Sequence, residues 1–163
     1  MNTSQTHPVF VYGTLRPGHH NHARLLLGHT TSEVRAHLSG HHLFLQGVPY
    51  AVPATHTSVY GAPTPLLGAL VRIAPDRYDQ VLADLDALEG YRPSRPERSH
   101  YLRVLVEVTV TALRSGGGTS NTVDQAWTYI AGPAFNPDRA TLIPSGDYER
   151  ADEHPSTPRR RPR

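Results

Sequence analysis

The chain of 163 residues is long enough for one domain with one hydrophobic core, and its 15 prolines and 13 glycines predict many turns. It contains no cysteine and no lysine, which excludes disulfides, thiolate metal sites, cysteine nucleophiles and lysine Schiff bases. The formal net charge of +2 comes from residues 151–163, because residues 1–150 hold twelve arginines and twelve acidic residues. We therefore expect no nucleic-acid partner, since a neutral body lacks a broad basic face.

The first half of the chain predicts short strands separated by turns. Residues 9–12 form an apolar, β-favouring run that ends at Gly13, which indicates a buried first strand. A turn of helix is expected within residues 19–27. Alternating apolar residues over 34–38 and 41–45 predict a hairpin that is broken at Ser39 and Gly40. Residues 47–65 are rich in proline and glycine and predict a long irregular connection, a kind of loop that often carries function.

The second half predicts one strand, one clear helix and then a strand pair. Residues 66–73 predict a strand, and the helix starts near Pro75 and stops at Gly90. Its apolar residues follow helical spacing, at Tyr78, Val81, Leu82, Leu85 and Leu88. Residues 101–111 alternate as a half-buried strand, residues 123–130 are its partner, and 133–147 are expected to be irregular. Many strands with one strong helix favour a mixed barrel-like sheet over a doubly wound one.

Glu89 is the first candidate for chemistry, because it follows Leu88 at the C-terminal end of the predicted helix. A carboxylate beside an apolar stripe loses hydration, which raises its pKa toward neutrality. The negative end of the helix dipole acts in the same direction. Spacing alone leaves open the alternative of a surface glutamate in the last turn.

The tetrapeptide Tyr12-Gly13-Thr14-Leu15 is the second candidate. A chain that leaves a buried strand through a glycine can turn backbone N–H groups outward to bind an anion. The same pattern is also typical of a purely structural turn.

Two groups of histidines, His19-His20-x-His22 and His41-His42, raise the question of a metal site. We expect no metal, because adjacent histidines in a strand point to opposite faces and no HExxH motif is present. The chain also lacks GxSxG and the glycine-rich phosphate-binding motifs, so we expect neither a serine hydrolase nor a cofactor.

These segments together resemble the γ-glutamylcyclotransferase superfamily, in particular its AIG2-like, γ-glutamylamine cyclotransferase-like members. The resemblance covers roughly residues 8–150. In chain order, the matching residues are Phe10-Val11-Tyr12-Gly13-Thr14-Leu15-Arg16 with Gly18, Asn21 and Leu25; Gly68; Leu85-Asp86 and Leu88-Glu89-Gly90; Tyr101 and Arg103; Ala126-Trp127 and Tyr129; and Ser145-Gly146-Asp147-Tyr148. One departure is Ala69, where many relatives carry an acidic residue, so no role is transferred to that position.

The resemblance implies an α+β fold, a compact mixed β-barrel with flanking helices. It also implies a reaction on a small γ-glutamyl amine or amide, in which the substrate's α-amine attacks its own γ-carbonyl and 5-oxoproline and a free amine are released. Glu89 would be the general acid and base. The γ-glutamyl group would bind the backbone of Tyr12, Gly13, Thr14 and Leu15, in a pocket lined by Tyr101 and Tyr129. The resemblance is compatible with a monomer or a homodimer.

We expect one domain over residues 8–150, with disordered ends at 1–7 and 151–163. The start of the chain lacks a signal-peptide pattern and no stretch approaches eighteen apolar residues, so we expect a cytoplasmic protein without membrane contact. Three alternatives remain open: a non-catalytic module that binds a small ligand, an interaction domain that acts through its arginine-rich tail, and an amidase or amide transferase that releases glutamate.

Overall fold

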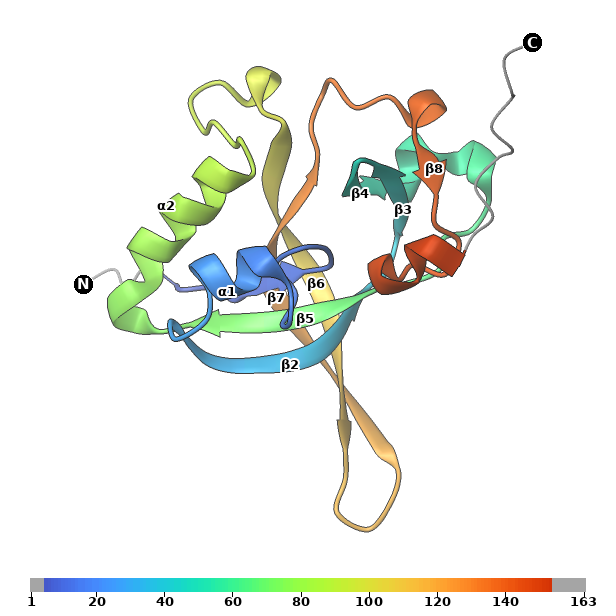
Figure 1. The fold of residues 1–163 in the computed structure, drawn as a ribbon. Coiled ribbons are helices and arrows are strands. Elements are labelled where there is room, and N and C mark those ends of the chain that lie inside the picture. The colour runs from blue at the N-terminus through green and yellow to red at the C-terminus, as the bar shows by residue number, and fades with distance from the viewer. Residues whose placement is uncertain (1–4, 154–163) are drawn as a thin grey trace.

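The structure, a computed structural model, describes residues 5–153. Residues 1–4 and 154–163, which belong to the predicted disordered ends, lie outside the described part, and the limits of the domain remain a prediction. Within residues 5–153, strands form a closed barrel in the order β1-β5-β2-β6-β7 (Figure 1). Their bounds are Val9–Val11, Leu66–Ile73, Thr30–Leu38, Tyr101–Leu113 and Thr119–Ala131.

The barrel is mixed, because β1 pairs in parallel with β7 while the other neighbours are antiparallel. The predicted α+β class with a mixed β-barrel is therefore confirmed. Gly68 of β5 is required by the packing, since a Cβ there would meet the Val11 carbonyl and the Phe10 ring. This close approach of two barrel strands explains one of the isolated glycines in the sequence.

A second sheet has three strands in the order β4-β3-β8, formed by Val48–Pro53, His41–Gln46 and Thr141–Leu142. The predicted hairpin across Ser39 and Gly40 is wrong: β2 pairs with β5 and β6, while β3 pairs with β4 and β8. The expectation of an irregular segment over 47–65 is also wrong for β4. Pro49 and Pro53 are tolerated there because β4 is an edge strand, where the missing N–H groups break no central ladder.

The two helices flank the barrel. The short α1 (His20–Leu25) lies within the expected segment, and α2 (Tyr78–Leu88) follows a 3₁₀ turn, η3 (Pro75–Arg77). Tyr78, Val81 and Leu85 are its buried residues, as the apolar spacing predicts. The α-helical part begins three residues after Pro75.

The end of α2 is fixed by a glycine. Gly90 has a φ of +63°, its N–H donates to the Ala87 carbonyl, and the Tyr91 N–H donates to the Asp86 carbonyl. This pair of bonds is the Schellman arrangement that ends many helices. It makes Glu89 the last residue before the chain turns away.

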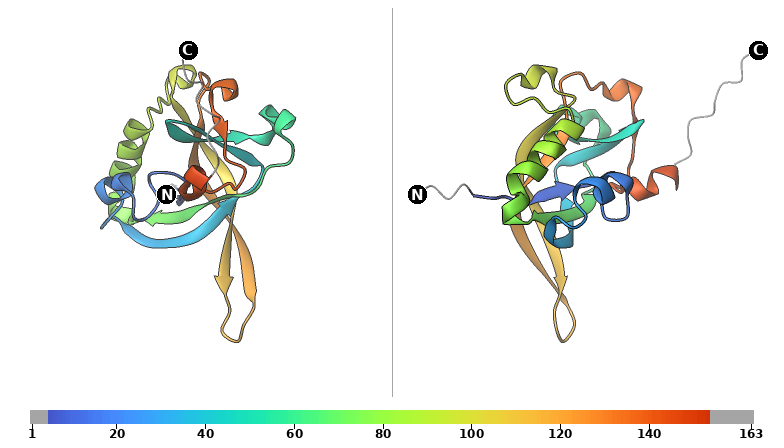
Figure 2. Two further views of the ribbon diagram at one scale, coloured as in Figure 1. Left: turned by 45° about the vertical axis from the view of Figure 1, so that its right-hand side comes forward. Right: turned by 60° about the vertical axis from the view of Figure 1, so that its left-hand side comes forward.

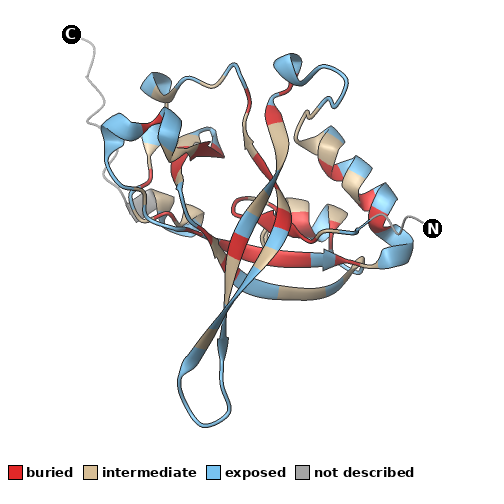
Figure 3. Cartoon of the chain, turned by 180° about the vertical axis from the view of Figure 1, so that it is seen from behind, coloured by how far each residue is buried: buried red, intermediate tan, exposed pale blue. Residues whose placement is uncertain are grey.

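The remaining elements are short 3₁₀ turns: η1 (Ala54–His56), η2 (Ser58–Tyr60), η4 (Pro96–Arg98), η5 (Pro137–Arg139) and η6 (Tyr148–Glu153). The far ends of β6 and β7 project from the barrel as a two-stranded arm (Figures 1 and 2). Figure 3 shows that the arm is exposed while the buried residues lie on the barrel and on the inner side of α2. No helix among residues 5–153 is long and apolar enough to span a membrane.

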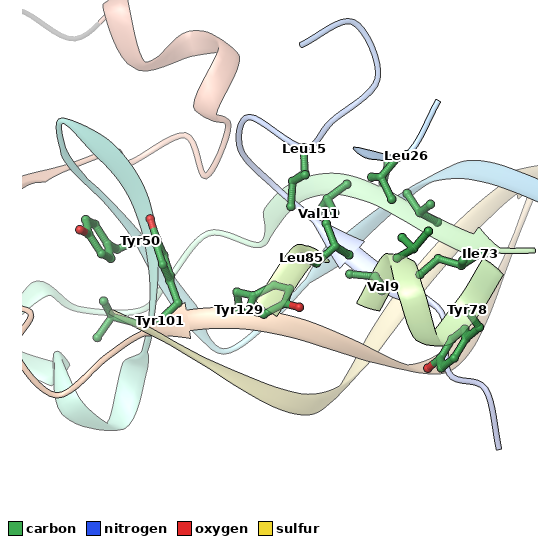
Figure 4. Close-up of a cluster of buried hydrophobic side chains, with 14 of the residues drawn as sticks. Val9, Val11, Leu15, Leu26, Tyr50, Ile73, Tyr78, Leu85, Tyr101 and Tyr129 are labelled. Atoms are coloured by element: carbon green, nitrogen blue, oxygen red, sulfur yellow. The ribbon is translucent and has the colours of Figure 1, made fainter. Parts of the chain in front are cut away.

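The main hydrophobic cluster is formed by residues of β1, β3, β4, β5 and α2, together with the start of β6 and the end of β7. Val9, Val11, Leu85 and Tyr129 belong to it, and Figure 4 shows them packed together. Tyr50 and Tyr101 stack at one end of this cluster, with ring centroids 4.9 Å apart. A cavity lies beside Tyr101.

Candidate active site

The cavity has a volume of about 180 Å³ and is lined by residues from the first and the second half of the sequence. All of the site residues expected from the sequence lie on its wall: Tyr12, Gly13, Thr14, Leu15, Glu89, Tyr101 and Tyr129. The wall also includes residues that are not among the predicted site residues, namely Asn21, Val48, Pro49, Leu88 and His100. Residues that are more than a hundred positions apart in the sequence therefore meet at one site.

Glu89 is held at the cavity by its backbone. Its N–H donates to the Leu85 carbonyl at 2.9 Å, and its carbonyl accepts from the Tyr101 N–H at 3.2 Å. The side chain is half-buried, and no group in residues 5–153 forms a hydrogen bond or ion pair with its carboxylate. Burial raises the pKa of Glu89 from 4.5 to about 7. The carboxyl group is therefore able to accept and donate protons near neutral pH.

The residues after β1 form a tight turn at the cavity wall. The Arg16 N–H donates to the Gly13 carbonyl at 3.1 Å, which closes the turn and leaves the N–H groups of Thr14 and Leu15 outside its hydrogen bonding. A Cβ on Gly13 would lie 2.5 Å from Pro49 Cγ, so only glycine fits. The predicted strand-glycine-turn geometry is present, with two N–H groups available to a ligand.

The three tyrosines of the wall have hydroxyl groups that are used by the framework. The Tyr12 hydroxyl donates to the Tyr129 carbonyl at 2.6 Å and accepts from the Ala51 N–H at 3.0 Å. The Tyr101 hydroxyl donates to the Pro49 carbonyl at 2.6 Å. Burial is the main cause of the raised pKa values of Tyr12 and Tyr101, and the Glu89 carboxylate contributes. These phenols stay protonated and shape the wall.

An ion pair beneath Glu89 joins three of the sequence motifs. The Tyr129 hydroxyl donates to Asp86 Oδ1 at 2.8 Å, and Arg103 Nε lies 3.3 Å from the same oxygen. The Arg103 guanidinium lies 4.9 Å from the centre of the Trp127 ring, a cation–π contact. Burial raises the pKa of Asp86, while Tyr129 and Arg103 oppose this effect. The network fixes α2 against β6 and β7.

A second ion pair joins the two ends of the matched region. Arg16 Nη1 lies 2.9 Å from Asp147 Oδ1, and both side chains are largely buried. The Gly13–Arg16 turn is thereby tied to residues 145–148. This contact gives a structural reason for the presence of the C-terminal motif.

The wall residues that were not predicted as site residues include Asn21 on α1, Val48 and Pro49 on the edge strand β4, and His100 just before β6. Asn21 Nδ2 donates to Thr14 Oγ1 at 2.9 Å, and His100 Nε2 shares a hydrogen bond of 2.8 Å with the Tyr50 hydroxyl. Val48 and His100 are exposed, while the rest of the wall is buried or half-buried. No periodicity marks such residues, and only the fold places them at the cavity.

The histidine groups have other partners. His22 Nε2 lies 2.7 Å from Glu33 Oε1, and His42 Nδ1 lies 2.7 Å from Thr57 Oγ1. In the part of the chain that the structure describes, no three histidine or acidic side chains come together as a metal site would require. That the protein binds no metal is still an expectation from the sequence.

The fold and the site define a small barrel protein with a carboxylate inside a mostly apolar cavity. The family model for gamma-glutamyl cyclotransferase, AIG2-like proteins matches residues 9–150, and the chain belongs to this family. At the level of the family, this membership makes the chain a cyclotransferase-type protein, and the family acts on small γ-glutamyl substrates. No curated protein matches the chain.

Solved structures share the fold. The crystal structure of an AIG2-like protein from Mus musculus superimposes with a TM-score of 0.61 at 22% identity, over 96% of this chain and 98% of the mouse chain. An uncharacterized protein from Pyrococcus horikoshii gives 0.53 at 20% identity, over 90% and 92% of the two chains. A solution structure from Arabidopsis thaliana gives 0.53 at 24% identity, over 92% and 85%.

Proposed function

We propose that the protein is a γ-glutamylcyclotransferase that cleaves a γ-glutamyl amide into 5-oxoproline and a free amine, with Glu89 as general acid and base. The observation that carries this proposal is the meeting of Glu89 with the Tyr12–Leu15 turn on one cavity of about 180 Å³. The carboxyl group has no partner among residues 5–153 and has a pKa of about 7. A titratable group in that state is typical of a catalytic acid or base.

The substrate supplies its own nucleophile. Glu89 takes a proton from the α-ammonium, and the free α-amine attacks the γ-carbonyl, which forms a C–N bond and a tetrahedral intermediate. Because both reacting groups belong to one molecule, correct orientation is equivalent to effective molarities of about 10⁵ to 10⁸ M. The protein therefore needs no covalent nucleophile, which agrees with a chain that has no cysteine.

The intermediate carries a negative charge on the former carbonyl oxygen. The free N–H groups of Thr14 and Leu15 are suited to stabilise this oxyanion, and one such donor is worth on the order of 10² to 10³-fold in rate. Glu89 then returns the proton to the departing amine as the amide C–N bond breaks, and the ring nitrogen passes its extra proton to the released amine, which leaves as an ammonium ion. Acid and base assistance of this kind contributes about 10² to 10⁴-fold.

Val48 and His100 are the exposed residues of the cavity wall, and we place the leaving amine beside them. The described residues of the cavity wall include no arginine, and its exposed positions carry an aliphatic side chain and an imidazole ring. These surfaces suit an amine with methylene groups next to its nitrogen better than one with a carboxylate there. We therefore propose γ-glutamyl amines as the substrate class.

Product identity tests the proposal. The purified protein is incubated with γ-glutamyl alkylamines and γ-glutamyl amino acids, and 5-oxoproline, glutamate and free amine are followed by mass spectrometry. We expect 5-oxoproline and free amine in equal amounts. Glutamate in place of 5-oxoproline would indicate hydrolysis, and ligand binding without any product would support the binding-module alternative.

A further inference from the structure

A hydrogen bond between Asn21 and Thr14 lies on the cavity wall, outside the groups used in the proposed chemistry. Asn21 is on α1 and Thr14 is in the Gly13–Arg16 turn, and both line the cavity. Asn21 Nδ2 donates to Thr14 Oγ1 at 2.9 Å. A hydroxyl group that accepts this bond still has its own proton to donate. No group in the described part of the chain accepts that proton.

Asn21 is itself held firmly, because the next residue anchors α1. His22 is only 5% exposed, and its Nε2 lies 2.7 Å from Glu33 Oε1 on β2. The Thr30 hydroxyl donates to the same carboxylate oxygen at 3.0 Å. The short helix therefore has a fixed position against the barrel, and Asn21 presents its amide to Thr14 from a rigid support.

The Thr14 hydroxyl is able to supply a hydrogen-bond donor for the α-carboxylate of the substrate. A γ-glutamyl group carries an α-carboxylate throughout the reaction, yet no arginine lines the described wall and the chain has no lysine. Neutral donors must then bind the carboxylate. The backbone N–H groups of the turn have a role at the oxyanion, and the phenols of Tyr12, Tyr101 and Tyr129 already donate elsewhere.

We propose that Thr14 is a substrate-binding donor to the α-carboxylate and that Asn21 is a positioning residue, which keeps the Thr14 hydroxyl proton directed into the cavity. This inference rests on the proposed function, since it assumes a γ-glutamyl ligand. A contact made equally in the ground state and the transition state affects KM and leaves kcat unchanged.

The test is a double-mutant cycle on KM and on the Kd of 5-oxoproline, which carries the same carboxylate. Thr14→Val raises both constants by about 10- to 100-fold with kcat within threefold of wild type, as expected for a lost bond to a charged group. Thr14→Ser keeps a hydroxyl donor and is expected to recover most of the loss that Thr14→Val causes in both constants. Asn21→Ala raises both constants by about 3- to 10-fold, but less than twofold further in the Thr14→Val background, because Asn21 acts through Thr14.

Asn21→Asp separates a positioning role from a merely structural one. An aspartate accepts the Thr14 proton and turns it away from the substrate, so we expect larger KM and Kd values than for Asn21→Ala. The aspartate charge also repels the carboxylate, so the variant is measured in the Thr14→Val background too, where only this repulsion remains. A structural role predicts the same effect of Asn21→Asp in both backgrounds. The control is Asn121→Ala on the exposed arm, where Asn121 bonds with Thr111 at 3.0 Å and no effect on either constant is expected.

Each outcome has a separate meaning. Additive effects of Thr14→Val and Asn21→Ala, or wild-type constants for Asn21→Asp, overturn the inference while the cyclotransferase activity stands. A wild-type protein that neither forms nor binds 5-oxoproline overturns the proposed function and the inference together.

Discussion

The backbone carbonyl of Glu89 accepts a hydrogen bond from the backbone N–H of Tyr101 at 3.2 Å. This bond ties the end of α2 to the start of β6, across the loop of residues 90–100. A carboxylate at the end of a helix is thereby fixed to the rigid barrel, and a rigid support is what acid–base chemistry requires.

Activity is expected to depend on pH through Glu89. Its pKa is raised to about 7, and the base form is needed to take the first proton from the α-ammonium. We therefore predict that kcat/KM rises about tenfold per pH unit below pH 7 and levels off above it. Initial rates from pH 5 to 9 measure this, and a profile that is flat from pH 5 to 7 would contradict the raised pKa.

Glu89→Gln is predicted to stabilise the fold at alkaline pH. The native state holds the Glu89 proton more tightly than the unfolded state, so wild-type stability falls as the pH rises from about 4.5 to about 7. Above pH 7 the free energy of unfolding of the variant exceeds that of wild type by on the order of 2 kcal/mol, after allowance for the partial exposure of the side chain. Near pH 4 this difference vanishes. Urea unfolding of both proteins at several pH values measures the difference. Glu107→Gln, on an exposed part of β6, is the control without such a trend.

Gly13→Ala is predicted to lose activity for a steric reason. The new Cβ would lie 2.5 Å from Pro49 Cγ, so the turn and β4 must move apart. Since misplacement of catalytic groups by about 1 Å can cost 10²-fold, we expect kcat/KM to fall by about that factor. The double variant Gly13→Ala, Pro49→Ala removes the clashing Cγ and is expected to recover at least tenfold. Failure to recover would show that Gly13 is required for another reason.

Asp86→Asn is predicted to destabilise the protein by about 1 to 3 kcal/mol, because it leaves the largely buried Arg103 without a carboxylate. The matched control is Asp124→Asn, which removes the partner of Arg72 in an exposed pair and is expected to cost less than about 1 kcal/mol. Chemical denaturation measures both changes. Equal effects would mean that the Asp86–Arg103 pair adds nothing beyond a surface contact.

Much of this arrangement is readable from local sequence patterns. The spacing of Tyr78, Val81 and Leu85 predicts α2, and the alternation along residues 101–111 predicts β6, because both patterns record one buried face. Gly90 marks the helix end through its left-handed conformation. The prediction that Glu89 and Tyr12–Leu15 line the same pocket came from the resemblance to a family, because no local pattern relates these distant segments.

Other parts were not predictable because they depend on distant pairing. The turn at Ser39 and Gly40 predicts a hairpin, yet β2 completes the barrel by pairing with β5 and β6, which lie far from it in the sequence. Pro49 argues against a strand in the sequence, but β4 is an edge strand, where a proline is tolerated. Asn21 and His100 reach the cavity only because α1 and the loop before β6 fold back on it.

The most direct measurement of the central claim is the rate of 5-oxoproline formation from γ-glutamyl alkylamines by wild type and by Glu89→Gln. The two proteins are compared by mass spectrometry at pH 8, with circular dichroism as the check on folding. We predict that wild type forms 5-oxoproline and that the folded variant is at least about 10²-fold slower. Equal rates for the two proteins, or no 5-oxoproline from wild type with any substrate of this class, would contradict the assignment of Glu89 as the acid and base of a cyclotransferase.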